Sequence, residues 1–269
     1  MDFLIAVLII AAIGLLVGVL LAFSAKIFAV KKDEREEFIR ELLPGANCGA
    51  CGYSGCDGYA KALAKGETEN VSLCSPGGNS VAGKLGEYLG LSAEEIIPHV
   101  ACVRCVGTCE TAQTKLEYSG VASCRLAMQL FDGHKVCRQG CLGFGDCVKA
   151  CPYDAIFICN GIARVSTNLC HNCKACVNVC PKHCIQMIPL TKKVAAVMCN
   201  NREKGAVARK ACKSACIACG KCERVCPVGA VKVVDNLSVI DENLCISCGK
   251  CAEGCPVKCI EMINQNFNA

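Results

Sequence analysis

The chain has 269 residues, of which 29 are cysteine, while tryptophan is absent and aromatic residues make up only 5%. Because aromatic side chains supply much of a normal core, cysteine is the obvious alternative source of cohesion. A secreted disulfide scaffold is excluded, since that class consists of short chains and this long chain shows no cleavable signal. The formal net charge of +5 counts cysteine as neutral, so it does not indicate nucleic-acid binding.

The first predicted element is an apolar helix that we expect to cross a membrane once. Residues 3–25 carry no charge, and about 20 apolar residues span a bilayer. The positive-inside rule places the rest of the chain in the cytoplasm, because the next charges are Lys26, Lys31, Lys32 and Arg35. Disulfides are rare in that reducing compartment, where cysteines serve as metal ligands. We therefore predict an anchor over residues 1–30 in the cytoplasmic (inner) membrane.

Residues 31–92 are predicted to form a small, mostly helical domain around one [4Fe-4S] cluster. The candidate ligands are Cys48, Cys51, Cys56 and Cys74. Glycines surround the first three, and glycine allows the positive φ angles that tight ligand loops require. A structural zinc site is the alternative. Such sites favour two CxxC-like pairs, whereas three clustered cysteines with one distant cysteine suit a cube better.

The segment 93–135 carries a second unusual set of cysteines and is predicted to be an extra cluster segment or linker. Its candidate ligands are Cys102, Cys105, Cys109 and Cys124. A zinc site or a set of free thiols is the alternative. Cys124 could also exchange roles with Cys137, because both lie within reach along the sequence.

Ferredoxin motifs fill the rest of the chain. Three runs read CxxCxxCxxxCP, the bacterial pattern in which three close cysteines hold one cube and the fourth reaches the neighbouring cube. These runs comprise Cys170, Cys173, Cys176 and Cys180, then Cys216, Cys219, Cys222 and Cys226, and finally Cys245, Cys248, Cys251 and Cys255. Hairpins between the motifs predict two ferredoxin-like α+β modules, over residues 136–192 and 193–266.

One earlier run departs from this pattern. It contains Cys141, Cys147 and Cys151, which the internal repeat maps onto Cys216, Cys222 and Cys226. The same mapping places Phe144 where the later run has Cys219. We expect Cys137 to supply the missing ligand.

Some cysteines remain outside these sets. The internal repeat also maps Cys212 onto Cys137 and Cys199 onto Cys124, yet the second module already has its full ligand set, so these two stay unassigned. Packing is a sufficient role for Cys159, Cys184 and Cys259.

The crossed ferredoxin rule provides the expected ligand sets of the modules. The first module combines Cys137, Cys141 and Cys147 with Cys180, and Cys170, Cys173 and Cys176 with Cys151. The second combines Cys216, Cys219 and Cys222 with Cys255, and Cys245, Cys248 and Cys251 with Cys226. With the two upstream sets, we expect about six [4Fe-4S] clusters. We expect no flavin or nucleotide, because the glycine-rich stretches lack the context of a dinucleotide site.

The chain resembles the B subunit of the Rnf complex over essentially its whole length. The resemblance rests on the apolar start, on GANCGACGYSGC with CSPGG at 74–78, and on GCLGFGDCVKACPYDAI before further ferredoxin motifs. It implies a subunit of a membrane ferredoxin:NAD+ oxidoreductase that couples electron flow to Na+ or H+ translocation. The expected partners are soluble ferredoxin, the other Rnf subunits and the membrane, without nucleic acid. We expect no catalytic residue on this subunit.

Two other functions stay open at this point. The chain could be an anchored polyferredoxin of another respiratory or hydrogenase-type complex, or an iron-sulfur redox sensor. The N-terminal cysteine domain argues against a generic polyferredoxin, and no DNA-binding or kinase-like segment supports a sensor.

Overall fold

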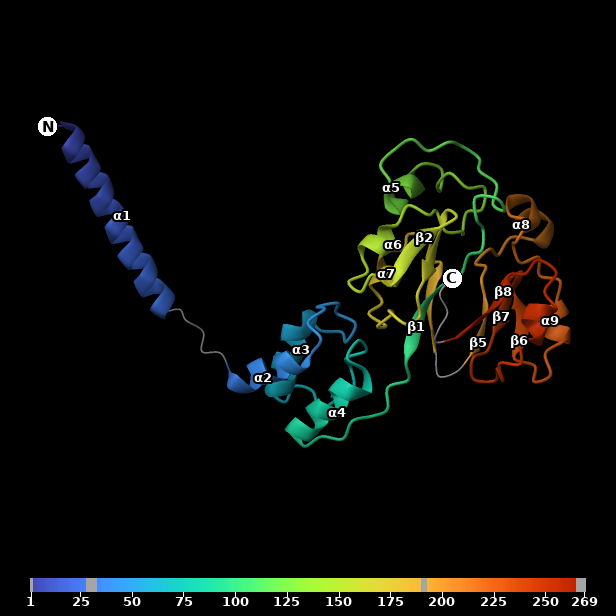
Figure 1. Cartoon of the computed structure of the whole chain (residues 1–269), viewed down its shortest axis with the longest axis horizontal. Helices are drawn as coiled ribbons and strands as arrows, with labels where there is room; N and C mark the ends of the chain where they lie inside the picture. The colour runs from blue at the N-terminus through green and yellow to red at the C-terminus, as the bar shows by residue number, and fades with distance from the viewer. Residues whose placement is uncertain (1, 28–32, 190–192, 265–269) are drawn as a thin grey trace.

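The computed structural model describes residues 2–27, 33–189 and 193–264 (Figure 1). The helices are α1 Asp2–Ile27, α2 Glu34–Leu42, α3 Gly55–Ala64, α4 Gly78–Leu89, α5 Cys124–Gln129, α6 Asp146–Lys149, α7 Ala175–Val179, α8 Gly205–Ala211, α9 Lys221–Arg224 and α10 Lys250–Glu253. The strands are β1 His99–Val103, β2 Ile156–Cys159, β3 Ile162–Val165, β4 Ile185–Pro189, β5 Val194–Val197, β6 Val231–Val234, β7 Leu237–Ile240 and β8 Ile260–Ile263.

The expected membrane anchor over residues 1–30 is not supported, and the predicted fold class is wrong in this element. Within the described ranges, no helix meets the combined requirement of length and apolar character for crossing a bilayer. Residues 1 and 28–30 of the predicted anchor lie outside those ranges. The prediction rested on a run of uncharged, mostly apolar residues over 3–25, compared with the length that spans a bilayer.

Helices α2, α3 and α4 form a small N-terminal domain. They enclose an apolar core that contains Ile39, Tyr59, Val71 and Leu85, each almost completely buried. The Tyr59 hydroxyl donates a 2.7 Å hydrogen bond to the carbonyl oxygen of Asn70, so the buried phenol keeps a polar partner. This core positions the loop before α3, which carries the first cysteines.

Among the described residues that follow the N-terminal domain, there are four two-stranded antiparallel sheets, and these pairings repeat. In the first half β2 pairs with β3 and β1 with β4, while in the second half β6 pairs with β7 and β5 with β8. The hairpin β2–β3 and its counterpart β6–β7 are separated along the sequence by the same offset as α6 and α9. Each half is therefore a ferredoxin-like α+β unit. We call them the first and the second module.

Strand β1 lies within residues 93–135, the segment that the cysteine spacing predicted to be an extra cluster segment or linker. It joins the first module through β4, where Val103 lies opposite Ile185. In the second module Val197 of β5 lies opposite Ile260 of β8, which is the equivalent position.

The two modules pack against each other through β1, β4, β5 and β8 (Figure 1). The buried side chains at this contact include Val100, Ile188 and Met198. Arg164 and Glu261 form a 3.4 Å ion pair across the interface, with both side chains mostly buried. The modules are therefore held in a fixed relation, which matters for any electron path between them.

Candidate iron-sulfur sites

All 29 cysteines are free thiols, and many of them surround a few cavities. In the first module one cavity of about 300 Å³ is lined by Cys151, Cys170, Cys173 and Cys176. We call these residues the Cys151 set. They are the four cysteines that the crossed ferredoxin rule groups together.

A second cavity of the first module, of about 330 Å³, is lined by Cys124, Cys141, Cys147 and Cys180. We call these residues the Cys124 set. It differs at one position from the predicted set, because Cys124 takes the place that was expected for Cys137. Burial, with the added charges of Cys141 and Cys124, raises the pKa of Cys147 to about 12.

The position of Cys124 follows from the start of α5. Ser123 caps this helix, and its Oγ donates a 2.9 Å hydrogen bond to Oδ2 of Asp146. The amide of Arg125 donates to the same oxygen at 3.0 Å. Because Asp146 begins α6 and immediately precedes Cys147, these bonds bring the two helix starts together.

Phe144, which stands where the second module has Cys219, packs against other aromatic rings. The ring of Phe144 lies 5.0 Å from Tyr118 and 5.1 Å from His134, centroid to centroid, in a small aromatic group. The sequence could identify the missing ligand but not its substitute, since no spacing rule connects Cys124 to the run that begins at Cys141.

In the second module Cys216, Cys219, Cys222 and Cys255 line a cavity of about 330 Å³. We call these residues the Cys216 set. Its members are those that the crossed rule groups together. The hydroxyl of Ser238 lies 3.1 Å from Cys222 Sγ, and both atoms are buried.

Two cysteines expected only to pack contact sulfurs of these sets. Cys184 Sγ lies 3.7 Å from Cys180 Sγ, and Cys259 Sγ lies 3.7 Å from Cys255 Sγ. The hydrogen bond from Cys184 lowers the pKa of Cys180 to about 6, and the bond from Cys259 lowers the pKa of Cys255 to about 5. These two thiols therefore lie within hydrogen-bond distance of candidate ligands, which packing alone did not predict.

The N-terminal set consists of Cys48, Cys51, Cys56 and Cys74. Cys51, Cys56 and Cys74 pack in one apolar cluster, and burial with the added charges of the other three cysteines raises the pKa of Cys74 to about 11. Asn47 Oδ1 accepts a 2.8 Å hydrogen bond from the amide of Cys56. Gly55, with φ 86°, faces that oxygen, and a Cβ there would lie 3.0 Å from it. Glycine is required by both the angle and the space.

The remaining ferredoxin set is Cys226, Cys245, Cys248 and Cys251, which we call the Cys226 set. Burial raises the pKa of Cys251, and the charges of Cys245 and of Cys222 raise it further. Each member is the repeat equivalent of a member of the Cys151 set. The Cys248 side chain is exposed.

The predicted set Cys102, Cys105, Cys109 and Cys124 is not brought together, and this grouping is corrected. Cys102 and Cys105 belong to different clusters of buried side chains. Alternate residues of a strand point to opposite faces, so Cys102 of β1 points toward Met198, 3.5 Å away from sulfur to sulfur. Cys109 is exposed and lies beside Gly161.

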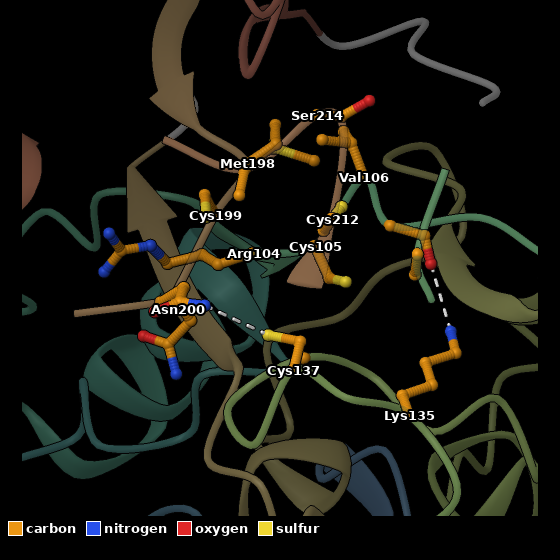
Figure 2. Close-up of a pocket in the computed structure, with 15 residues that line it drawn as sticks. Arg104, Cys105, Val106, Lys135, Cys137, Met198, Cys199, Asn200, Cys212 and Ser214 are labelled. Atoms are coloured by element: carbon orange, nitrogen blue, oxygen red, sulfur yellow. Dashed lines mark hydrogen bonds between the residues drawn. The ribbon is translucent and has the colours of Figure 1, made fainter. Parts of the chain in front are cut away.

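One more cavity, of about 360 Å³, is lined by Cys105, Cys137, Cys199 and Cys212 (Figure 2). We call these residues the shared set, because two come from the first module and its leading segment and two from the second. Spacing had placed Cys105 and Cys137 in other sets and had left Cys199 and Cys212 unassigned.

The donor chemistry of these cavities fits [4Fe-4S] clusters. Each cavity is lined by at least four thiols, the number that one cube requires. In the described ranges, no three or more His, Cys, Asp and Glu side chains form a group that could hold a metal ion. A cube has a different geometry from a single ion, because each thiolate binds a different iron of the inorganic core.

Family comparisons agree with this chemistry. The family model FeS, which describes an Fe-S cluster, matches residues 43–76. A 4Fe-4S binding domain matches residues 163–186, and a 4Fe-4S dicluster domain matches residues 215–259. The chain thus carries several [4Fe-4S] binding regions.

Whole-chain comparisons decide the family. The chain is 42% identical to the B subunit of the Na(+)-translocating ferredoxin:NAD(+) oxidoreductase complex of Acetobacterium woodii, over 87% of this chain and 70% of that protein. It is 40% identical to the proton-translocating counterpart of Clostridium ljungdahlii, over 86% and 82%. The chain belongs to the family of Rnf complex B subunits. A third member, the B subunit of the ion-translocating oxidoreductase complex of Methanosarcina acetivorans, is 36% identical over 88% and 89%.

Membership of the Rnf family confirms the resemblance seen in the sequence. The chain is an iron-sulfur electron-transfer subunit of an Rnf complex, an ion-translocating oxidoreductase. This decides against the two alternatives, an anchored polyferredoxin of another complex and a redox sensor.

Proposed function

We propose that this subunit accepts single electrons from reduced ferredoxin on the cytoplasmic side of the membrane and passes them toward NAD+ reduction. The other Rnf subunits couple this flow to Na+ or H+ translocation. Membership of the Rnf complex supports a membrane-associated location. A bound [4Fe-4S] cluster supplies one-electron transfer, while the protein supplies ligands, spacing and electrostatics.

The ligands are assigned from the cavities and the repeat. The N-terminal set, the Cys151 set and the Cys124 set serve the first half of the chain, and the Cys216 and Cys226 sets serve the second. Together they take Cys48, Cys51, Cys56 and Cys74; Cys151, Cys170, Cys173 and Cys176; Cys124, Cys141, Cys147 and Cys180; Cys216, Cys219, Cys222 and Cys255; and Cys226, Cys245, Cys248 and Cys251.

The observation that carries the proposal is that neighbouring sets adjoin. Burial and then the charge of Cys48 raise the pKa of Cys173, so the N-terminal set acts electrostatically on the Cys151 set. The ring of Tyr153 stacks on His171 at 4.3 Å, centroid to centroid, beside the same cysteines. Adjacent sites permit electron transfer because tunnelling weakens steeply with distance.

The same relation joins the sets inside each module. The charge of Cys176, from the Cys151 set, acts on Cys147 of the Cys124 set. In the second module the charge of Cys222 acts on Cys251. Each module therefore places its two sets side by side, as the crossed ferredoxin arrangement requires.

The Cys226 set is the proposed entry for electrons. Cys248 is exposed, and its neighbours Leu244 and Ile246 are 52% and 54% exposed, which gives an apolar contact surface next to the site. Lys221 and Lys250 are exposed at the starts of α9 and α10. These positive charges suit an acidic electron donor such as ferredoxin.

Anaerobic mixing of the full chain with reduced ferredoxin tests the proposal. We expect ferredoxin to be oxidised as the clusters of the subunit are reduced, with one electron gained per electron lost, measured by absorbance and by EPR. A chain fully loaded with iron and sulfide that ferredoxin does not reduce would contradict it.

A further inference from the structure

The shared set lies where the two modules meet. Its four cysteines are each between 5% and 8% exposed, and they surround the cavity of about 360 Å³ (Figure 2). None belongs to a CxxCxxCxxxCP run, and they come from four separate segments. Four buried thiols around one cavity require an explanation, because unrelated packing cysteines have no reason to converge.

Each module contributes an equivalent cysteine after its first paired strand. Cys105 lies shortly after the end of β1 at Val103, and Cys199 shortly after the end of β5 at Val197. The amide of Arg104 donates to the carbonyl oxygen of Cys184 at 2.7 Å, and the amide of Met198 donates to that of Cys259 at 2.7 Å. The backbone therefore carries the two sulfurs to matching places.

The second cysteine of each pair is also equivalent, since the internal repeat maps Cys137 onto Cys212. Residues 111–115 run between their two segments. The amide of Val136 donates to the carbonyl oxygen of Gln113 at 2.8 Å, and the amide of Gln113 donates to that of Ala211 at 2.9 Å. These bonds, with the isolated bridges that pair Ala112 with Cys212 and Thr114 with Lys135, connect the segments of Cys137 and Cys212 across the module boundary.

Two glycines lie directly against these sulfurs. A Cβ on Gly107 would lie 3.3 Å from Cys212 Sγ and 3.5 Å from Cys105 Sγ. A Cβ on Gly140 would lie 3.3 Å from Cys137 Sγ and 3.6 Å from Cys105 Sγ. Each glycine backbone thus lies close to two of the sulfurs, and together the two backbones approach three of the four.

Hydrogen-bond donors point at two of the four sulfurs. The amide of Cys216 donates to Cys199 Sγ at 3.3 Å. Cys141, the residue equivalent to Cys216, packs with Cys105 in one cluster of buried side chains. Asn201 Nδ2 lies 3.5 Å from Cys137 Sγ and is buried. Donors of this kind stabilise thiolates bound to iron.

Positive charge lines the same cavity. Lys135 is 4% exposed, and its Nζ donates 3.0 Å hydrogen bonds to the carbonyl oxygens of Gly107 and Gly161. Arg104 also lines the cavity and donates from Nε to the carbonyl oxygen of Val197 at 3.2 Å. Buried cations suit a cube with four thiolates, which carries about −2 when oxidised.

We propose that Cys105, Cys137, Cys199 and Cys212 hold a [4Fe-4S] cluster that relays electrons between the two modules, an inference that rests on the proposed function. Cys105 packs with Cys141 of the Cys124 set in one buried cluster, and Cys199 accepts a hydrogen bond from the amide of Cys216 of the Cys216 set. The site thus joins the electron paths of the two modules. Each electron that enters from one neighbouring cluster leaves to the other, and no bond forms or breaks.

Paired substitutions in the full chain test the site. The double variant Cys199→Ser with Cys212→Ser removes the two candidate ligands of the second module. The double variant Cys105→Ser with Cys137→Ser removes the two from the first module and its leading segment. The control is Cys109→Ser with Cys159→Ser, because both residues are exposed and belong to none of the sets. Iron, acid-labile sulfide and zinc are measured per chain after anaerobic purification, with Mössbauer spectra of the iron.

We expect each pair to lose about four iron atoms per chain and the control to lose none. The quadruple variant should lose the same four as either pair, because all four cysteines bind one cube. That equality separates a shared site from two independent ones and from general unfolding.

Three results would overturn the inference: wild-type iron content in either pair, losses that add in the quadruple variant, or one zinc per chain that disappears with the pairs. A wild-type chain without [4Fe-4S] clusters would instead refute the proposed function itself.

Discussion

The two ferredoxin-like modules match at three candidate ligands of one site and differ at the fourth. Cys141, Cys147 and Cys180 of the first module correspond to Cys216, Cys222 and Cys255 of the second. In the second module the fourth cysteine is Cys219, inside the run. In the first module that position is Phe144, and Cys124 reaches the cavity from α5.

This difference shows that the position of a sulfur in space matters more than its spacing along the chain. A short run delivers its cysteines through one loop, so the sequence reveals them. Cys124 instead depends on Asp146, which binds the start of α5 to the start of α6.

The largest expected effect comes from removing and then restoring the fourth ligand. Cys124→Ser should lose about four iron atoms, as should Cys219→Ser in the second module. Adding Phe144→Cys to Cys124→Ser should restore most of that iron, since it gives the first module the motif of the second. The measurement is iron and sulfide per chain.

The matched control for this experiment is Phe144→Cys alone, which should keep wild-type iron. Full iron in Cys124→Ser would show that Cys124 is not a ligand and that the modules do not differ as described.

A second prediction concerns the entry of electrons at the second module. Lys221→Glu with Lys250→Glu should slow reduction by ferredoxin about tenfold at low ionic strength, because charge steering is lost. The difference should shrink as salt is raised. Stopped-flow mixing measures the rate.

Lys61→Glu in the N-terminal domain is the control and should leave the rate within about twofold. If Lys61→Glu slowed reduction as much as the double variant, the result would show that ferredoxin does not dock at the Cys226 set.

A smaller effect is expected at the cap that positions Cys124. Ser123→Ala should lower the free energy of unfolding of the first module by about 1 kcal/mol, the usual cost of losing an N-cap. Ser123→Thr keeps the cap and should stay close to wild type. Anaerobic denaturant titrations measure both, and equal stability of the two variants would rule out the cap as the anchor of α5.

The smallest effect concerns the two thiol donors. Cys184→Ala and Cys259→Ala should keep full iron but lower the midpoint potential of one cluster in each module by about 20–40 mV. A hydrogen bond worth about 0.5–1 kcal/mol corresponds to that shift in a one-electron couple. Redox titrations followed by EPR test this. An unchanged midpoint potential in both variants would show that Cys184 and Cys259 only pack.

The sequence alone predicts candidate ligands where they lie in short loops. The runs that begin at Cys170 and Cys216 are visible as spacing, because each loop wraps one cube. Cys105 and Cys199 were not visible in this way, since their places depend on the register of β1 with β4 and of β5 with β8. Those strands are far apart in sequence, and no local pattern fixes their pairing.

The set proposed at Cys102 failed for a related reason. Spacing alone grouped Cys102 with Cys105, but the first lies within β1 and the second just after it, and they pack on different faces. The predicted transmembrane helix over residues 1–30 is not supported either, because no helix in the described ranges meets the combined test of length and apolar character. By contrast, the internal repeat of the sequence is present in the structure as equivalent helices and strand pairs. Both modules bury the same kinds of side chain at the same positions.

Iron and acid-labile sulfide in the anaerobically purified full chain test the central claim most directly. Six sets of four cysteines, including the shared set, predict about 24 iron atoms and about 24 sulfides per chain, all as [4Fe-4S] clusters. A content of about 20 or fewer iron atoms in fully folded protein, or zinc in place of iron, would contradict the account.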